Sequence, residues 1–370
     1  MTKNIALSRL FSVILIVFSI FSLINAQIDF SYDYSVYIYY IDSISQLDIL
    51  YVFRNIFAYF PLPYVTVPPA AVFEGGFVII TLVLTSIGFP SFIVYAAISS
   101  LSITIRAYVI DKASIGIITN IILTLSYVTL LEANAIRVGL SSSILLLSLL
   151  CIYKKRLLMS VLLFFTALFV HIQSFIYVIS FIIGFTICVI SIDSKQRRAF
   201  LSVLGIISVG LLIPYVGTSS GTKIDDYLLR QSASTGFNIL SVSGLLICLY
   251  SIYFILRQDV KTVRSFNSII WFSSFFAFAQ ATIFLIIGGA YADIGIRVWQ
   301  FAFLFFVIST AIFAKMQDMS VAEQIILYRL RILILACCLF QTINVIIRYP
   351  LSNFFYPLIP YVNIEYINFW

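Results

Sequence analysis

Charge and histidine are both scarce in this chain. Of its 370 residues only 10% are charged, 62% are hydrophobic, and a single histidine is present. A soluble protein of this length could not bury so much apolar surface, whereas runs of about 20 apolar residues are typical of membrane helices. One histidine excludes a His-rich metal site. The chain also lacks a glycine-rich phosphate-binding loop, so nothing indicates a nucleotide site.

The five cysteines give no sign of a ligand set. They lie within or at the ends of apolar runs, and none has a metal-ligand spacing with the histidine. We expect buried free thiols that act as small apolar side chains, and no structural disulfide.

Clusters of basic residues interrupt the apolar runs. They lie at 154–156, 195–198, 257–264 and 315–331, and the net charge is +7. Because these clusters fall mostly in short loops, the positive-inside rule accounts for them, and no nucleic-acid partner is expected. If all four are cytoplasmic, the chain crosses the membrane an even number of times between each pair. We therefore predict an all-α polytopic integral membrane protein with about 11 transmembrane helices, in one domain over residues 1–370.

Alternation assigns the individual spans. The first apolar run follows Lys3 and Arg9 as in a signal peptide, but its length favours an uncleaved first helix and a cytoplasmic N-terminus. The predicted spans are residues 6–26, 91–110, 115–131, 137–154, a hairpin of two short helices between 157 and 192, then 199–216, 237–256, 266–290, 298–314 and 332–347. The predicted outer segments are a long first loop over 27–90, a second loop over 217–236 and an aromatic tail over 349–370.

The apolar stretch 72–110 decides the parity of all later spans. It is long enough for two crossings and is broken at Gly88-Phe89-Pro90. Two crossings would place the basic cluster at 154–156 on the outer side, so only one is allowed. We expect residues 74–87 to form a helix that lies at the outer surface without spanning.

The same parity places several polar residues at the outer face. Arg137 opens a predicted helix after a turn that contains Glu132 and Asn134, and an arginine at a helix N-terminus suits phosphate. The alternative is a Glu132–Arg137 ion pair that closes the turn. His171, with Gln173 beside it, is predicted at the tip of the short hairpin, level with Arg137. It could bind an anionic oxygen or move a proton, or be a structural residue.

Three further outer positions complete the predicted site. Asp33 could accept a proton from a sugar hydroxyl, and the ring of Tyr37 could stack on a sugar; the alternative is a solvated acidic loop. Glu74 opens the non-spanning helix, where capping would explain it equally well. Arg297 is predicted at the start of a helix, as a second cationic group or as an interface anchor.

Four stretches together resemble the EpsG family of Wzy-type polysaccharide polymerases. They are Asp33-Tyr34 with Tyr37, Glu74-Gly75-Gly76-Phe77, Ala135-Ile136-Arg137, and Ala167-Leu168-Phe169-Val170-His171. Their order and spacing over residues 29–180 carry the resemblance, although Val138 stands where the family usually has glutamine. The layout is also similar to the GT-C class of lipid-phosphate-sugar transferases. That likeness implies a long first periplasmic loop carrying a membrane-parallel helix.

The resemblance implies a glycosyltransferase that joins polyprenyl-diphosphate-linked oligosaccharide repeat units into O-antigen, capsule or exopolysaccharide. The reaction would take place at the periplasmic face of the bacterial inner membrane. The expected catalytic residues are Asp33 or Glu74 as base, with Arg137 and His171 stabilising the leaving diphosphate. The expected substrate-binding residues are Tyr37, Glu132, Asn134, Gln173 and Arg297.

The expected partners are the lipid-linked donor and acceptor, membrane lipid and a chain-length regulator protein. No cofactor or metal is expected, with a divalent ion on Asp33 and Glu132 as the alternative. An O-antigen ligase or a lipid-linked sugar transferase would use much the same site. A flippase would instead line a central cavity with charge across the membrane midplane, and an acyltransferase would pair its histidine with an acid or asparagine.

Overall fold

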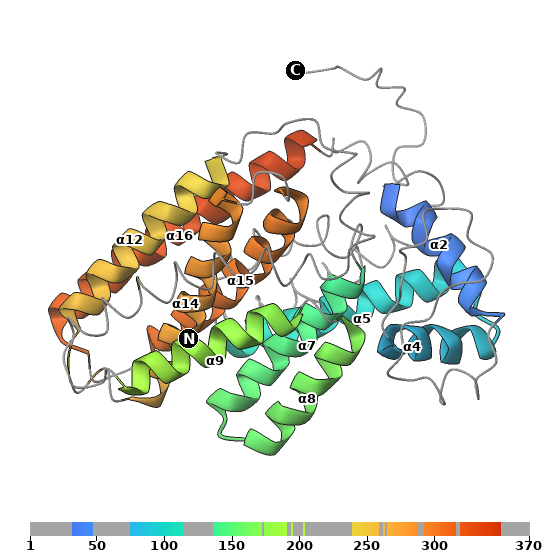
Figure 1. The fold of residues 1–370 in the computed structure, drawn as a ribbon, viewed down its shortest axis with the longest axis horizontal. Helices are drawn as coiled ribbons and strands as arrows, with labels where there is room; N and C mark the ends of the chain where they lie inside the picture. The colour runs from blue at the N-terminus through green and yellow to red at the C-terminus, as the bar shows by residue number, and fades with distance from the viewer. Residues whose placement is uncertain are drawn as a thin grey trace, which may run out of the picture.

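All of the secondary structure described here is α-helical. The computed structural model describes residues 32–46, 75–113, 136–171, 174–190, 239–258, 265–287, 292–315 and 319–348, together with positions 194, 203 and 262. In this part of the chain there are ten helices and no strand (Figure 1). Three of them, α5, α7 and α14, are long and apolar enough to cross a membrane, and several others are shorter apolar helices. An all-α membrane protein is thereby confirmed, and the number of about 11 spans stays a prediction.

The helices follow the chain in a simple order. They are α2 (Tyr32–Ile44), α4 (Gly75–Ser86), α5 (Ser91–Ala113), α7 (Ile136–Tyr153), α8 (Leu157–Val170), α9 (Ser174–Ile190), α12 (Ile239–Arg257), α14 (Phe266–Ile287), α15 (Ala292–Phe313) and α16 (Val321–Arg348). In Figure 1, α12, α14, α15 and α16 form one side of the molecule, α2 and α4 lie at the other, and α5, α7, α8 and α9 lie between.

Helices α5 and α7 run in the same direction. Ser102 Oγ lies 3.0 Å from Ser143 Oγ, and the ammonium groups of Lys112 and Lys154 lie 5.5 and 6.0 Å from the centroid of the Tyr108 ring. Lys112 closes α5 and Lys154 follows α7, so both helices finish at one end of the bundle, which we call the lysine end. The opposite end, where both helices begin, we call the arginine end. The span expected over 115–131 lies outside the described residues and stays a prediction.

The segment after α7 turns back on it as a hairpin. Ser148 Oγ donates to the Ser160 carbonyl oxygen at 2.8 Å, and Ser141 Oγ donates to the Ala167 carbonyl oxygen at 2.9 Å. This pairing makes α7 and α8 antiparallel, so α8 ends at the arginine end. There His171 takes an extended conformation, with φ −157° and ψ 113°, and terminates the helix. The two short helices predicted between 157 and 192 are α8 and α9, and α8 ends just before His171 while α9 begins at Ser174, as expected for His171 between them.

The C-terminal helices pack through aromatic rings. Trp271 Nε1 donates to Thr310 Oγ1 at 3.1 Å and Trp299 Nε1 donates to Thr282 Oγ1 at 3.0 Å, which makes α14 and α15 antiparallel. Ring stacking fills the space between them. These indole N–H groups need partners because water cannot reach them in an apolar core.

Helix α9 joins the two parts of the bundle. Its Tyr177 ring lies 4.3 Å from that of Phe305 in α15. Two turns further along the chain, Gly184 permits close approach to α14: a Cβ there would lie 2.7 Å from Phe276 Cβ and 3.0 Å from Ser273 Cα. A larger residue would separate α9 from α14.

Two helix starts differ from the sequence expectation. Helix α16 begins at Val321, not near 332, so Arg329 and Arg331 lie within the helix and not in a basic loop. The cause is a capping box: Ser320 N and Oγ both donate to Glu323 Oε2, at 2.8 and 2.9 Å, and Glu323 N donates back to Ser320 Oγ. Helix α15 begins at Ala292, so Arg297 is its sixth residue and not its first.

The short helix α4 has both ends at the arginine end. Its 12 residues reach about 18 Å, less than the roughly 30 Å of a hydrocarbon core. Gly76 in its first turn lies against Phe169 near the end of α8. After Gly88, with φ +97°, the chain enters α5 at Ser91, whose hydroxyl hydrogen-bonds the Asp42 carboxylate. This is the geometry of a helix that does not span, and its position along a membrane stays a prediction.

The position of α4 leads to a labelling prediction. Ile87, 65% exposed in the turn after α4, is replaced by cysteine and treated with a membrane-impermeant maleimide in intact cells. The native cysteines in the described helices are buried and should remain unlabelled. We expect Ile87→Cys to react without permeabilisation and Lys155→Cys, at the lysine end, to react only after it. Reaction of Ile87→Cys only after permeabilisation, with Lys155→Cys reacting without it, would show that α4 crosses the membrane.

Candidate functional site

Arg137 stands at the start of α7 and is held by a buried tyrosine. Its Nε donates to Tyr37 Oη at 3.3 Å, and its guanidinium carbon lies 5.9 Å from the centroid of the Tyr37 ring. The Tyr37 ring in turn meets Phe77 and Tyr95 edge to face, with centroids 6.1 Å apart in each pair. One residue from each of α2, α4 and α5 therefore fixes the direction of a permanently charged guanidinium.

His171 is placed by hydrogen bonds of its own backbone. Its N–H donates to the Ala167 carbonyl oxygen at 2.9 Å, and its carbonyl oxygen accepts from Ser174 N at 3.1 Å. Ser141 Oγ donates to the same Ala167 oxygen and hydrogen-bonds Ser174 Oγ. Since Ser141 follows Arg137 by one helical turn, the buried imidazole and the guanidinium belong to the same end of the same three helices.

The first turn of α4 closes the other side of this end. A Cβ at Gly76 would lie 2.7 Å from Phe169 Cδ1 and 2.8 Å from its carbonyl oxygen, so only glycine allows this approach. The contact lies two residues before His171. Glu74 directly precedes the helix and lies outside the described residues.

The electrostatics of the arginine end favour an anion. Helices α4, α7 and α9 all begin there, and each N-terminus carries partial positive charge on its free N–H groups. Arg137 adds a full charge and a planar donor fork suited to phosphate. The arrangement can therefore hold a diphosphate and stabilise negative charge that grows on it.

The structure places three of the predicted site residues at the arginine end: Tyr37 and Arg137, which are in contact, and His171. Asp33 lies in α2 one turn before Tyr37, with its side chain outside the described part. Arg297 lies in α15 one turn before Phe301, whose ring is 5.1 Å from that of Tyr177 near the start of α9. The side chain of Arg297 is also outside the described part, as are Glu132, Asn134 and Gln173 entirely. Among the residues that are described, no three possible metal ligands come together.

One buried charge and two hydroxyl groups were not assigned a role from the sequence. Arg106 is 3% exposed within α5, with Nη2 3.5 Å from Ser143 Oγ. A charged residue inside an apolar span is a candidate functional residue in its own right. The position of Arg106 within the apolar run 91–110 could have identified it from the sequence. Ser141 and Ser174 were missed because a serine in an apolar helix carries no signal until its partner on another helix is known.

A model of the EpsG family matches residues 10–363 of the chain. No curated protein and no solved structure matches this chain. The family match covers both the hairpin that carries His171 and the C-terminal helices, which the sequence resemblance reached only through Arg297.

The α4–α8 contact leads to a stability prediction. Gly76→Ala should destabilise the protein by about 1–3 kcal/mol, because the new methyl group meets backbone atoms of Phe169 that cannot move independently. Without the contact, alanine would stabilise a helix relative to glycine by about 1 kcal/mol, so the sign is diagnostic. Thermal unfolding in detergent measures the effect, with Ser86→Ala at the exposed end of α4 as control. An unchanged or raised unfolding temperature for Gly76→Ala would contradict this packing.

Proposed function

This chain belongs to the EpsG family, and we propose from that premise that it is an oligosaccharide repeat-unit polymerase that uses a lipid-diphosphate donor. Family membership and the apolar helices make it a polysaccharide-polymerase-type membrane protein. The observation that supports the finer assignment is the gathering of Arg137, His171 and three helix N-termini at one end of the bundle. A surface reaction on an anionic lipid headgroup needs this one-sided distribution of charge.

The proposed reaction transfers a growing glycan from its carrier. A hydroxyl oxygen of the acceptor repeat unit attacks the anomeric carbon of the donor, and the bond from that carbon to the diphosphate oxygen breaks. A base takes the hydroxyl proton, and polyprenyl diphosphate leaves with the bonding electron pair. Arg137 and His171 stabilise the charge that grows on the leaving oxygen. No nucleotide is consumed, because the phospho-sugar bond supplies the free energy.

Asp33 is the proposed base, with Glu74 as the alternative. Asp33 and Tyr37 are separated by four residues of α2, so they share a face of that helix, and Tyr37 bonds Arg137. Glu74 precedes Gly75, where α4 begins against the end of α8. Both sequence positions adjoin described residues of the arginine end, which supports either carboxylate as the proposed base. Glu132, Asn134, Gln173 and Arg297 are proposed to bind the sugar and diphosphate.

The proposed orientation follows from the two ends of the bundle. Lys112, Lys154, Lys155 and Arg156 lie at the lysine end, which the positive-inside rule places in the cytoplasm. The arginine end then faces the periplasm across the bacterial inner membrane, and the layout is GT-C-like. The product is O-antigen, capsule or exopolysaccharide. The partners are the two lipid-linked substrates, surrounding lipid and a chain-length regulator, without a cofactor. Family membership favours this reading over a ligase or a flippase.

Substitution of Arg137 tests the proposed catalytic role. Arg137→Ala should lower chain extension by about 10²–10³-fold, the usual loss when one donor to a developing anion is removed. Gel ladders of the surface polysaccharide measure extension, and an epitope tag measures the amount of inserted protein. Arg156→Ala, exposed at the lysine end, serves as the control and should give a normal ladder. Normal polymer length in Arg137→Ala would refute the role.

A deletion strain separates the proposed function from its rivals. Loss of a polymerase should leave a single repeat unit attached to the lipid core, because transfer of one unit does not need polymerisation. Loss of a ligase or flippase should leave no repeat unit at all. The ladder of the deletion strain, complemented with the wild-type chain, distinguishes the two patterns.

A further inference from the structure

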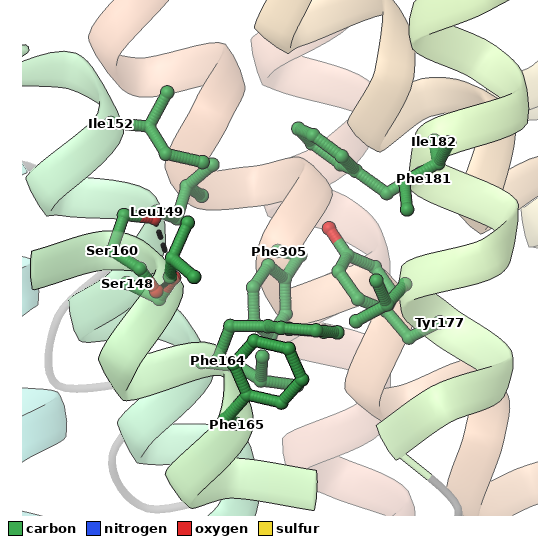
Figure 2. Close-up of a pocket in the computed structure, with 13 residues that line it drawn as sticks. Ser148, Leu149, Ile152, Ser160, Phe164, Phe165, Tyr177, Phe181, Ile182 and Phe305 are labelled. Atoms are coloured by element: carbon green, nitrogen blue, oxygen red, sulfur yellow. Dashed lines mark hydrogen bonds between the residues drawn. The ribbon is translucent and has the colours of Figure 1, made fainter. Parts of the chain in front are cut away.

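An apolar cavity of about 360 Å³ lies between α7, α8 and α9 (Figure 2). Five aromatic rings line it, contributed by Phe164, Phe165, Tyr177, Phe181 and Phe305. Ser148 and Ser160 also reach its wall, and their hydroxyl groups hydrogen-bond each other at 2.8 Å. An apolar occupant would therefore leave these two hydroxyl groups paired.

The cavity opens sideways between two helices that diverge. Helix α8 packs mainly on α7 and α9 packs mainly on α14, and Figure 2 shows the lining side chains of α8 and α9 facing each other across the space. The residues at its margin, Val161, Phe165 and Ile182, are at least half exposed. Apolar side chains exposed on apolar helices face lipid in a membrane protein, so the opening is toward lipid and not toward water.

The cavity lies on the same helix faces as the cationic end of the bundle. On α7, Arg137, Ser141, Leu145 and Leu149 are spaced by four residues, and the last two line the cavity. On α9, Ser174 and Tyr177 share a face, with Tyr177 in the cavity wall. The polar turn of His171 joins α8 and α9 at the arginine end. The cavity therefore begins one turn from Ser141 on α7 and one turn from Ser174 on α9, on the lysine-end side of Arg137 and His171.

We propose that this cavity binds one isoprenoid chain of the polyprenyl diphosphate, whose diphosphate lies at Arg137 and His171. The assignment rests on the proposed function and adds the position of a lipid tail to it. A cationic end two helical turns from an apolar, lipid-accessible cavity on the same helix matches a ligand with an anionic head and a long apolar chain. The ring-lined walls offer flat faces for the methyl branches of an isoprenoid, and a volume of about 360 Å³ has room for a segment of one such chain.

Photocrosslinking tests where the chain lies. A benzophenone amino acid is placed at Ile182, 55% exposed at the cavity margin, or at Ile190, 61% exposed on the same helix outside the cavity. Detergent-solubilised full-length protein is irradiated with radiolabelled polyprenyl diphosphate. We expect a labelled adduct at 182 at least tenfold stronger than at 190. Equal labelling at the two positions, or an adduct at 182 formed only with phospholipid, would overturn the proposal.

Filling the cavity provides the second measurement. Val161→Trp adds bulk at the half-exposed margin, where folding tolerates it, and Leu158→Trp adds the same bulk one turn earlier on the 76% exposed face of α8. Val161→Trp should reduce both the adduct at 182 and chain extension at least tenfold, and Leu158→Trp should change neither. Two variants with the same adduct yield and the same ladder would reject the site.

The two proposals fail in different ways. If Arg137→Ala stops chain extension and polyprenyl diphosphate labels neither 182 nor 190, the polymerase assignment stands and the lipid site is wrong. If the probe labels 182 and Val161→Trp prevents it, but the deletion strain makes normal polymer, the lipid site stands and the polymerase assignment is wrong.

Discussion

The hydroxyl group of Ser141 is the contact on which the arginine end depends. It donates to the Ala167 carbonyl oxygen of α8 and hydrogen-bonds Ser174 of α9, so one side chain joins three helices around the turn that bears His171. Inside a membrane no water can replace such bonds, and each polar group must find a partner in the protein. Arg137 lies one turn earlier on α7, so the helix that Ser141 anchors also positions the guanidinium. The turn that carries His171 and the guanidinium are thus held in fixed relation by a residue that need not take part in chemistry.

The bundle is built by two kinds of packing, and the cavity lies where they meet. Helices α5, α7 and α8 contact through small residues and serine pairs such as Ser102–Ser143 and Ser148–Ser160. Helices α14 and α15 contact through stacked rings, with tryptophan N–H groups bonded to threonines. Small residues bring backbones close, whereas large rings hold them apart. Helix α9 packs on α14, on the side with the large rings, and therefore stands apart from α8. The lipid-accessible cavity between α8 and α9 is a consequence of this difference in packing.

Local signals predicted most helix positions well. The non-spanning helix expected over 74–87 and the spans expected over 91–110 and 137–154 correspond closely to α4, α5 and α7, because long apolar runs bounded by proline, glycine or lysine define them without tertiary help. The starts of α15 and α16 were placed too late. For α16 the missed signal was local, the Ser320–Glu323 capping box, which outweighs the basic residues that follow. Arg106 was not predicted because it lies in the middle of a span, whereas charge parity indicated only residues at the outer face.

Composition alone determined that this is a helical membrane protein, and charge predicted that its basic loops share one side, because hydrophobic run length and positive-inside bias are properties of short segments. The tertiary structure alone decided that Tyr37 bonds Arg137 across 100 residues, that Gly76 admits α4 to Phe169, and that a slot opens between α8 and α9. Such contacts depend on the shapes of side chains on different helices, and no local pattern records which surfaces will meet.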